Sequence, residues 1–295
     1  MLHGVFTALA TPFLPDGSLD IPSLLKLLRA QLNAGVHGIV LLGTTAETPT
    51  LTAVEKKQIL DVCANEIKKA GRQLIIGAGT NSTTHTVENV RLAASYQPNA
   101  VLVVTPYYNK PNPSGMVAHF KAAASVGVPL VLYHIPGRTG QKLPPAVLGT
   151  LLKEIPQLVG IKESDYDLPH VTDTATKYAK RISYLCGNDD LFLPFLSLNA
   201  AGIISAAACV LAPGFIKIYN AFKSNQPQQA FEIFAQMYPL IKACYFETNP
   251  TCIKYMLSKL GYGTDVVRLP LGPISAENKT KIDTLLAQTP RELFL

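Results

Sequence analysis

Lys162 ends a short apolar segment, residues 158–161, and its side-chain amine is the group in this chain with the most informative chemistry. A lysine amine is protonated in water and is then a poor nucleophile, but partial burial favours the neutral form. The neutral amine can attack a ketone to form an imine, which withdraws electrons and lets the neighbouring carbon lose a proton. Lys162 therefore predicts Schiff-base catalysis. The alternative is a strand-end lysine that extends its ammonium group into water.

Other polar side chains follow short apolar segments in the same way: Tyr133, Tyr108 and the pair Thr44 and Thr45. A phenol can transfer protons when its partners tune it. Two neighbouring hydroxyls and the backbone N–H groups of a turn can bind a small carboxylate. Taken alone, each residue is more often structural, as a buried tyrosine with a bonded hydroxyl or as part of an ordinary turn.

Arg138 lies in a segment rich in proline and glycine, residues 136–140, just after Tyr133. A guanidinium group can bind a carboxylate through two parallel hydrogen bonds. An isolated arginine would more often lie on the surface without a partner of this kind. If these residues lie together at the ends of neighbouring strands, the site would contain an amine, phenols, paired hydroxyls and a guanidinium group. This combination predicts an enzyme that acts on a small keto acid.

The elements that must position these residues alternate along the chain. Eight short apolar segments predict buried strands: residues 5–10, 38–42, 74–78, 100–105, 130–133, 158–162, 183–186 and 202–205. Amphipathic segments between them predict helices: residues 21–34, 52–69, 82–95, 114–125, 144–154, 168–180, 190–198 and 213–223. This alternation predicts an α/β chain that forms a (β/α)8 TIM barrel, with the reactive residues at the carboxyl ends of the strands. An open doubly wound sheet is the alternative, but no GxGxxG motif follows the first strand.

The last 70 residues or so lack strand signals and instead show three apolar helical faces, within residues 231–241, 253–260 and 282–286. We therefore expect a barrel over residues 1–225 that carries the active site. Residues 226–295 are expected to form a C-terminal appendage of three helices, whose apolar faces pack on the barrel or on another subunit.

The composition fits an enzyme of small molecules. The chain is 48% hydrophobic, and its net charge of +6 is spread without a long basic run, which argues against nucleic-acid binding and suits anionic substrates. The five cysteines form no CxxC pair and the six histidines no HxH or HExxH pattern, so we expect reduced thiols and no metal. The N-terminus shows no secretory signal. The uncharged stretch 191–216 is interrupted by proline, glycine and polar residues, which disfavours a membrane span.

The chain resembles the 4-hydroxy-tetrahydrodipicolinate synthase (dihydrodipicolinate synthase) family, within the pyruvate-dependent class I aldolases that include N-acetylneuraminate lyase. The resemblance runs essentially end to end and rests on the motifs GTTAE at 43–47, VTPYYN at 104–109, LY at 132–133, PGRTG at 136–140, GIKE at 160–163, GIIS at 202–205 and NP at 249–250. It implies a lyase that condenses pyruvate with L-aspartate-4-semialdehyde to give 4-hydroxy-tetrahydrodipicolinate, in diaminopimelate and lysine biosynthesis. It also implies a cytoplasmic homo-oligomer, a tetramer built as a dimer of dimers, that needs no metal or organic cofactor. A related aldolase of the sialic acid or sugar-acid type is the alternative, against which Arg138 counts.

The resemblance also implies a role for individual residues. Lys162 corresponds to the Schiff-base lysine and Tyr133 to the central proton donor and acceptor. Thr44 and Tyr108 correspond to its relay partners, and Tyr107 to a tyrosine that reaches across a subunit interface. The substrate-binding positions are Thr45, the backbone of Ile204, Gly187 and Arg138. A barrel that only binds a keto acid would be expected to lack one of the catalytic residues, and none is lost.

The chain departs from the family pattern at a few positions. Ala46 replaces the usual glycine after the two threonines and is expected to prevent a left-handed turn there. His134 stands where asparagine is common, and residues 164–167 differ from the usual sequence after the lysine. Some relatives are inhibited by lysine, and Tyr107 and Asn81 match two of the positions that contact lysine in them. At three other such positions, this chain has Ala53, Lys56 and His85 in place of two histidines and a glutamate. Inhibition by lysine is therefore expected to be weak or absent.

Overall fold

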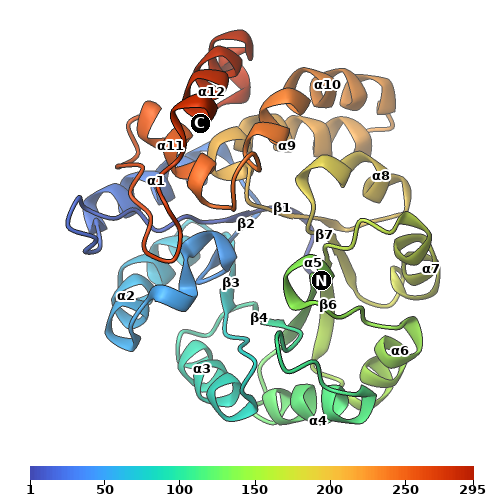
Figure 1. The fold of residues 1–295 in the computed structure, drawn as a ribbon. Coiled ribbons are helices and arrows are strands. Elements are labelled where there is room, and N and C mark those ends of the chain that lie inside the picture. The colour runs from blue at the N-terminus through green and yellow to red at the C-terminus, as the bar shows by residue number, and fades with distance from the viewer. The chain divides into compact units, whose positions relative to one another are not determined.

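The computed structural model describes residues 1–295, and its eight strands form a closed parallel barrel in the order β1 to β8 (Figure 1). The predicted (β/α)8 barrel is therefore confirmed. The strands are β1 (Gly4–Ala8), β2 (Gly38–Leu41), β3 (Gln73–Gly77), β4 (Ala100–Val104), β5 (Leu130–His134), β6 (Leu158–Glu163), β7 (Ser183–Cys186) and β8 (Gly202–Ser205). Their near-continuous apolar sequences suit strands of a parallel sheet, which is buried on both faces.

Helices separate the strands and continue after the last one. They are α1 (Ile21–Ala34), α2 (Ala53–Lys69), α3 (Thr83–Ser95), α4 (Pro113–Ala124), α5 (Pro136–Thr139), α6 (Pro145–Glu154), α7 (Leu168–Tyr178), α8 (Phe192–Ser197), α9 (Ala208–Lys223), α10 (Pro227–Ala243), α11 (Thr251–Lys259) and α12 (Ala276–Gln288). Helix α2 begins with a capping box, since the Thr52 side chain accepts from the N–H of Glu55, whose carboxylate accepts from the N–H of Thr52. The three predicted C-terminal helices are confirmed as α10, α11 and α12.

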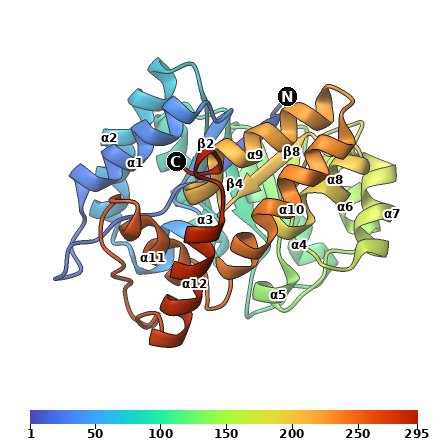
Figure 2. The same ribbon diagram turned by 90° about the horizontal axis from the view of Figure 1, so that it is seen from above.

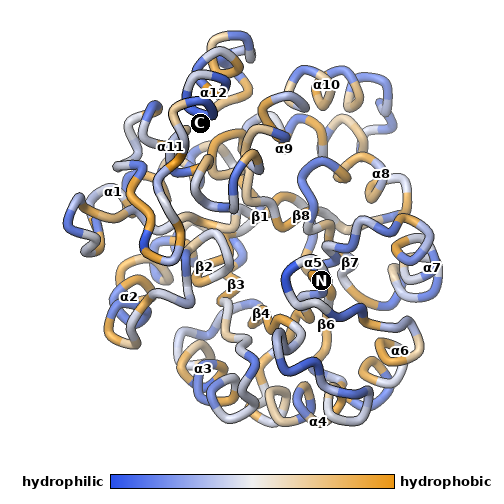
Figure 3. Tube along the Cα trace, in the orientation of Figure 1, coloured by the Kyte–Doolittle hydropathy of each residue, from blue (hydrophilic) through white to orange (hydrophobic).

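The chain divides into two compact units, which we describe separately. The first unit comprises Met1–His3 and Gln73–Ile203 and contains β3 to β7. Its helices α3, α4, α6 and α7 lie outside these strands (Figure 1). The tube of Figure 3 is orange along β4 and β6, and it alternates between orange and blue along α3 and α6, as expected of half-buried helices. Neighbouring strands are in parallel register, and Tyr133 of β5 pairs with Lys162 of β6.

The second unit comprises Gly4–Arg72 and Ile204–Leu295. It contains β1 paired with β2, the helices α1 and α2, and all helices from α9 onward. Helix α9 contacts β1 and α10, while α11 and α12 contact each other, as Figure 2 shows for the C-terminal helices. The predicted division into residues 1–225 and 226–295 stays a prediction.

Two local predictions need correction. Helix α9 begins at Ala208 and not at Pro213, because a short helical stretch precedes a kink at Leu211, whose φ and ψ are −114° and 27°. Pro213 opens the regular part of this helix, and proline at a first turn resembles a helix start in the sequence. The four-residue helix α5, which contains Arg138, was also not predicted. No helix of the structure has the length and apolar character needed to span a membrane.

Candidate active site

Lys162 and Tyr133 meet in the first unit at the carboxyl ends of β6 and β5. The Nζ atom of Lys162 lies 4.3 Å from the centroid of the Tyr133 ring. Both residues are buried, each 6% exposed. An aromatic face stabilises an ammonium ion, and the phenol oxygen of the same ring can exchange protons with groups formed at the amine. The structure thus brings together the two residues predicted to perform the central chemistry.

Gly187 follows β7 and lies against the lysine side chain. A Cβ atom at this position would lie 3.0 Å from Cε of Lys162 and would overlap the hydroxyl of Ser164. The Gly187 N–H donates to the carbonyl of Glu163 at 2.7 Å, which extends the contact between β6 and β7. The absence of a side chain therefore allows Ser164 and the Lys162 side chain to pack directly against this backbone.

Arg138 lies in α5, directly after β5. Pro136 opens this single turn, and Gly140 closes it with a left-handed φ of 69° while its N–H donates to the carbonyl of Pro136 at 2.8 Å. Arg138 lies five residues after Tyr133, and its side chain is exposed. A guanidinium group on such a rigid turn is well suited to bind the carboxylate of an incoming substrate.

The two consecutive tyrosines after β4 differ in environment. Tyr107 is half-buried, and its carbonyl accepts from the N–H of Asn109 at 2.8 Å. Tyr108 is 89% exposed and has a left-handed φ of 69°, which is uncommon for a residue with a bulky side chain. Unusual backbone conformations of this kind cluster at functional sites.

The two threonines of the GTTAE motif belong to the second unit, where they open a 3₁₀ turn, Thr44–Ala46. Ala46 adopts a right-handed conformation, and the left-handed residue is Glu47, with φ of 53°. The methyl group of Ala46 is therefore compatible with the turn, because the turn needs its left-handed residue one position later. Ile204, whose backbone is also predicted to bind substrate, lies in β8 and is fully buried.

A buried polar network holds this turn and was not predicted from the sequence. The side-chain amide of Asn249 donates to Oγ1 of Thr45 at 3.2 Å. The ammonium of Lys254 donates to Oε1 of Glu47 at 2.7 Å, and the backbone N–H of Arg268 donates to the other carboxylate oxygen at 2.8 Å. The signals in the sequence were the NP motif at 249–250 and a lysine within the otherwise apolar face of α11. Asn249 and Lys254 thus connect the C-terminal helices to the threonine turn.

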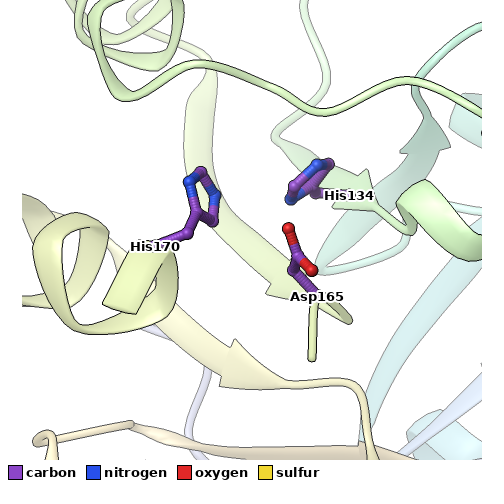
Figure 4. Close-up of side chains that lie close together, drawn as sticks. All are labelled: His134, Asp165 and His170. Atoms are coloured by element: carbon purple, nitrogen blue, oxygen red, sulfur yellow. The ribbon is translucent and has the colours of Figure 1, made fainter. Parts of the chain in front are cut away.

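A second polar cluster lies on the face of β5 and β6 opposite to the lysine and tyrosine, where His134, Asp165 and His170 offer ligand atoms within 4.8 Å of one another (Figure 4). Both ring nitrogens of His134 already have partners: Nδ1 pairs with Oε1 of Glu163 at 2.7 Å, and Nε2 accepts from the N–H of Leu143 at 2.9 Å. A metal ligand would need one of these nitrogen lone pairs. The arrangement therefore fits a hydrogen-bond network better than a metal centre.

Comparisons with known proteins identify the family of this chain. Residues 1–289 match the model of the dihydrodipicolinate synthetase family. The chain is 38% identical, over 98% of its length and 97% of the relative, to the 4-hydroxy-tetrahydrodipicolinate synthase of Methanothrix thermoacetophila. The structure of the synthase from Methylacidiphilum fumariolicum SolV superposes with a TM-score of 0.95 at 32% identity, covering 99% of this chain and 97% of that one. A monomeric dihydrodipicolinate synthase variant gives 0.94 at 33% identity, with 98% and 97% covered. This chain belongs to the dihydrodipicolinate synthetase family.

Proposed function

We propose that this chain, a lyase of that family, condenses pyruvate with L-aspartate-4-semialdehyde through an imine on Lys162, and so forms 4-hydroxy-tetrahydrodipicolinate for diaminopimelate and lysine biosynthesis. The observation that supports the imine most directly is the enclosed amine of Lys162, 4.3 Å from the centroid of the Tyr133 ring. The relatives described above are synthases, and Arg138 suits a second substrate with its own carboxylate. Neither observation favours an aldolase of sialic acids or sugar acids.

The proposed reaction begins when the neutral amine of Lys162 attacks the ketone carbon of pyruvate and expels its oxygen as water, which leaves an imine. Tyr133, with Thr44 and Tyr108 as relay partners, then removes a proton from the methyl carbon to give an enamine. The enamine carbon forms the new bond to the aldehyde carbon of the semialdehyde. Finally the amino group of that substrate attacks the imine carbon and displaces the lysine, which closes the ring and frees the enzyme.

The hydrogen bonds of the threonine turn support a role for Thr45 in carboxylate recognition. Since Oγ1 of Thr45 accepts from Asn249, the Thr45 hydroxyl is oriented to donate its own proton elsewhere, and we assign that donation to the pyruvate carboxylate. We assign the backbone of Ile204 and Gly187, whose backbone packs against the Lys162 side chain, to the surroundings of the imine. Arg138 binds the carboxylate of the semialdehyde.

The exposure of Tyr108 supports a homo-oligomer in which a tyrosine of one chain enters the site of another. The sequence suggested Tyr107 for this crossing, but Tyr108 is the residue that extends into solvent, 89% exposed. We therefore propose that Tyr108 both crosses the interface and completes the proton relay, in a tetramer built from two dimers. The five cysteines are thiols that form no disulfide, which supports a cytoplasmic location.

We also propose that the reaction needs no metal or organic cofactor, because the imine of Lys162 itself withdraws the electrons. Prolonged dialysis against EDTA is expected to leave turnover unchanged. A loss of activity that added metal restores would contradict this part of the proposal.

The test of the central step is reduction with borohydride in the presence of pyruvate, followed by mass spectrometry of peptides. We expect a pyruvate-derived adduct on Lys162 of the wild-type chain and none in the folded Lys162→Ala variant. A folded wild-type protein without any adduct would rule out the imine mechanism. If the adduct forms but the semialdehyde gives no product, the second substrate is a different aldehyde.

A further inference from the structure

His134 and Glu163 follow the two central residues of the site on neighbouring strands. Tyr133 pairs in register with Lys162, and His134 pairs with Glu163. Because side chains alternate along a strand, His134 and Glu163 lie on the opposite face from the catalytic pair. There Nδ1 of His134 and Oε1 of Glu163 are 2.7 Å apart, and the two side chains are 0% and 1% exposed. A buried bond between side chains thus joins the strand ends that carry the amine and the phenol.

The partners of His134 define its protonation. The backbone N–H of Leu143 donates to Nε2 at 2.9 Å, so Nε2 has no proton. The proton of the neutral ring is then on Nδ1, which donates to Glu163. The same carboxylate oxygen accepts from the N–H of Asp165 at 2.9 Å. Glu163 is therefore held by two donors, and one of them is the imidazole.

The bond to Leu143 extends the influence of His134 to the segment that contains Arg138. This segment leaves β5 after His134, forms α5, and reaches Leu143 before α6 begins. Within it, the Thr139 hydroxyl donates to the carbonyl of Ile135 at 3.1 Å. The imidazole holds the far end of the segment to the strand from which it starts, so the position of Arg138 depends on both ends being anchored.

We propose that His134 is a positioning residue with two separable effects. Through Nδ1 and Glu163 it sets Lys162 relative to Tyr133, and through Nε2 and Leu143 it sets the segment that carries Arg138. The first effect governs imine formation with pyruvate, and the second governs binding of the carboxylate-bearing aldehyde. This inference rests on the proposed function, since it assumes the imine at Lys162.

Two substitutions separate the effects, because amide side chains of different length reach the two nitrogen positions. In His134→Asn the amide reaches the position of Nδ1, so the bond to Glu163 is retained and the bond to Leu143 is lost. We expect the imine to form at the wild-type rate while KM for the semialdehyde rises about two- to tenfold, as for loss of one neutral hydrogen bond.

In His134→Gln the amide reaches the position of Nε2, so the bond to Glu163 is lost. Here we expect imine formation to slow about tenfold or more, as for loss of a hydrogen bond to a charged group.

A third variant distinguishes geometry from charge. Glu163→Gln keeps an oxygen that accepts from His134 and from Asp165, and we expect imine formation within about threefold of the wild type. The control is His119→Asn, because His119 is also a buried histidine of the first unit, bonded through Nδ1 to the Thr83 hydroxyl at 3.0 Å. It lies in α4, away from the strand ends, and should change neither rate nor KM.

The measurements are the rate of adduct formation in a single turnover, trapped with borohydride, and KM for each substrate, all per folded molecule as judged by circular dichroism. The inference is supported if His134→Asn raises only KM for the semialdehyde, His134→Gln slows imine formation, and Glu163→Gln forms the imine at a near-normal rate. Parallel losses in both His134 variants, or wild-type values in both, overturn it. Absence of an adduct in the wild type itself would instead overturn the proposed function, so the two failures are distinguishable.

Discussion

The ammonium of Lys254 donates to Oε1 of Glu47 over 2.7 Å, and both side chains are 1% exposed. The two residues are 207 positions apart in the sequence, and Glu47 immediately follows the turn that carries Thr44 and Thr45. Burial lowers the pKa of Lys254 to about 8, although the neighbouring carboxylate opposes that shift. Desolvation thus outweighs attraction for this lysine, as is common for buried ion pairs, and the pair serves to hold one geometry.

Replacing Lys254 with methionine is expected to destabilise the fold strongly. The variant keeps a long side chain but leaves the Glu47 carboxylate buried without its cation, which should lower the free energy of unfolding by about 3–5 kcal/mol. Unfolding in urea measures this loss. Lys259→Met is the control, because Lys259 lies on the same helix with a side chain 45% exposed and is expected to change stability by less than about 1 kcal/mol. Equal losses in the two variants would contradict the assignment.

The same lysine predicts a dependence of stability on pH. Its pKa in the folded chain is about 8, below the ordinary value of 10.5, so between these two values the unfolded chain binds more protons. Stability contributed by this group therefore rises with pH across that window, by about 3 kcal/mol in total. The difference in unfolding free energy between the wild type and Lys254→Met should grow as the pH increases. A constant difference would show that the buried amine titrates as it does in water.

Tyr133→Phe separates imine formation from proton transfer. The ring face beside Lys162 is retained, so borohydride should still trap pyruvate on the lysine. Turnover is expected to fall about 100- to 10,000-fold because the phenol that moves the proton is lost. Tyr178→Phe is the control, since the Tyr178 hydroxyl donates to the carbonyl of Pro145 at 3.0 Å on the outer helices. If Tyr133→Phe retained turnover, another group would have to carry the proton.

Mixed oligomers test the crossing tyrosine. Chains with Lys162→Ala and chains with Tyr108→Phe should each be nearly inactive alone. When the two are unfolded and refolded together, a mixed dimer would contain one site with an intact lysine and an intact Tyr108 from the neighbour. We expect activity well above that of either parent. The same mixture made with Tyr107→Phe should show no such gain, and the reverse result would assign the crossing to Tyr107.

Lysine is expected to inhibit weakly or not at all. Lys56 would place a positive charge near a cationic ligand, and Ala53 and His85 lack the groups found in inhibited relatives. Steady-state rates at millimolar lysine should match those without it. Introducing Ala53→His, Lys56→His and His85→Glu together should create measurable inhibition. Strong inhibition of the wild type at lower lysine concentrations is the result that would disprove this expectation.

The sequence revealed the local features of this fold better than its long-range pairs. Strand ends such as Lys162 and Tyr133 could be located because apolar segments of strand length stop there, and the barrel then brings adjacent strand ends together. The bond between Asn249 and Thr45 joins residues 204 positions apart, and no local pattern predicts such a contact. The expectation that Ala46 is not left-handed agrees with the structure, but the left-handed φ of Glu47 was not predicted, because it depends on how the whole turn is held and not on the residue type alone.

The contacts of Asn249 and Lys254 with the threonine turn have a consequence for how this enzyme could be divided or recombined. The region after residue 225 supplies the amide that orients Thr45 and the ammonium that neutralises Glu47. A chain trimmed to the barrel would therefore lose the contacts that hold the threonine turn together with the trimmed helices. Exchange of this region between relatives is expected to preserve the conformation of the threonine turn only when the donor supplies the same amide and ammonium.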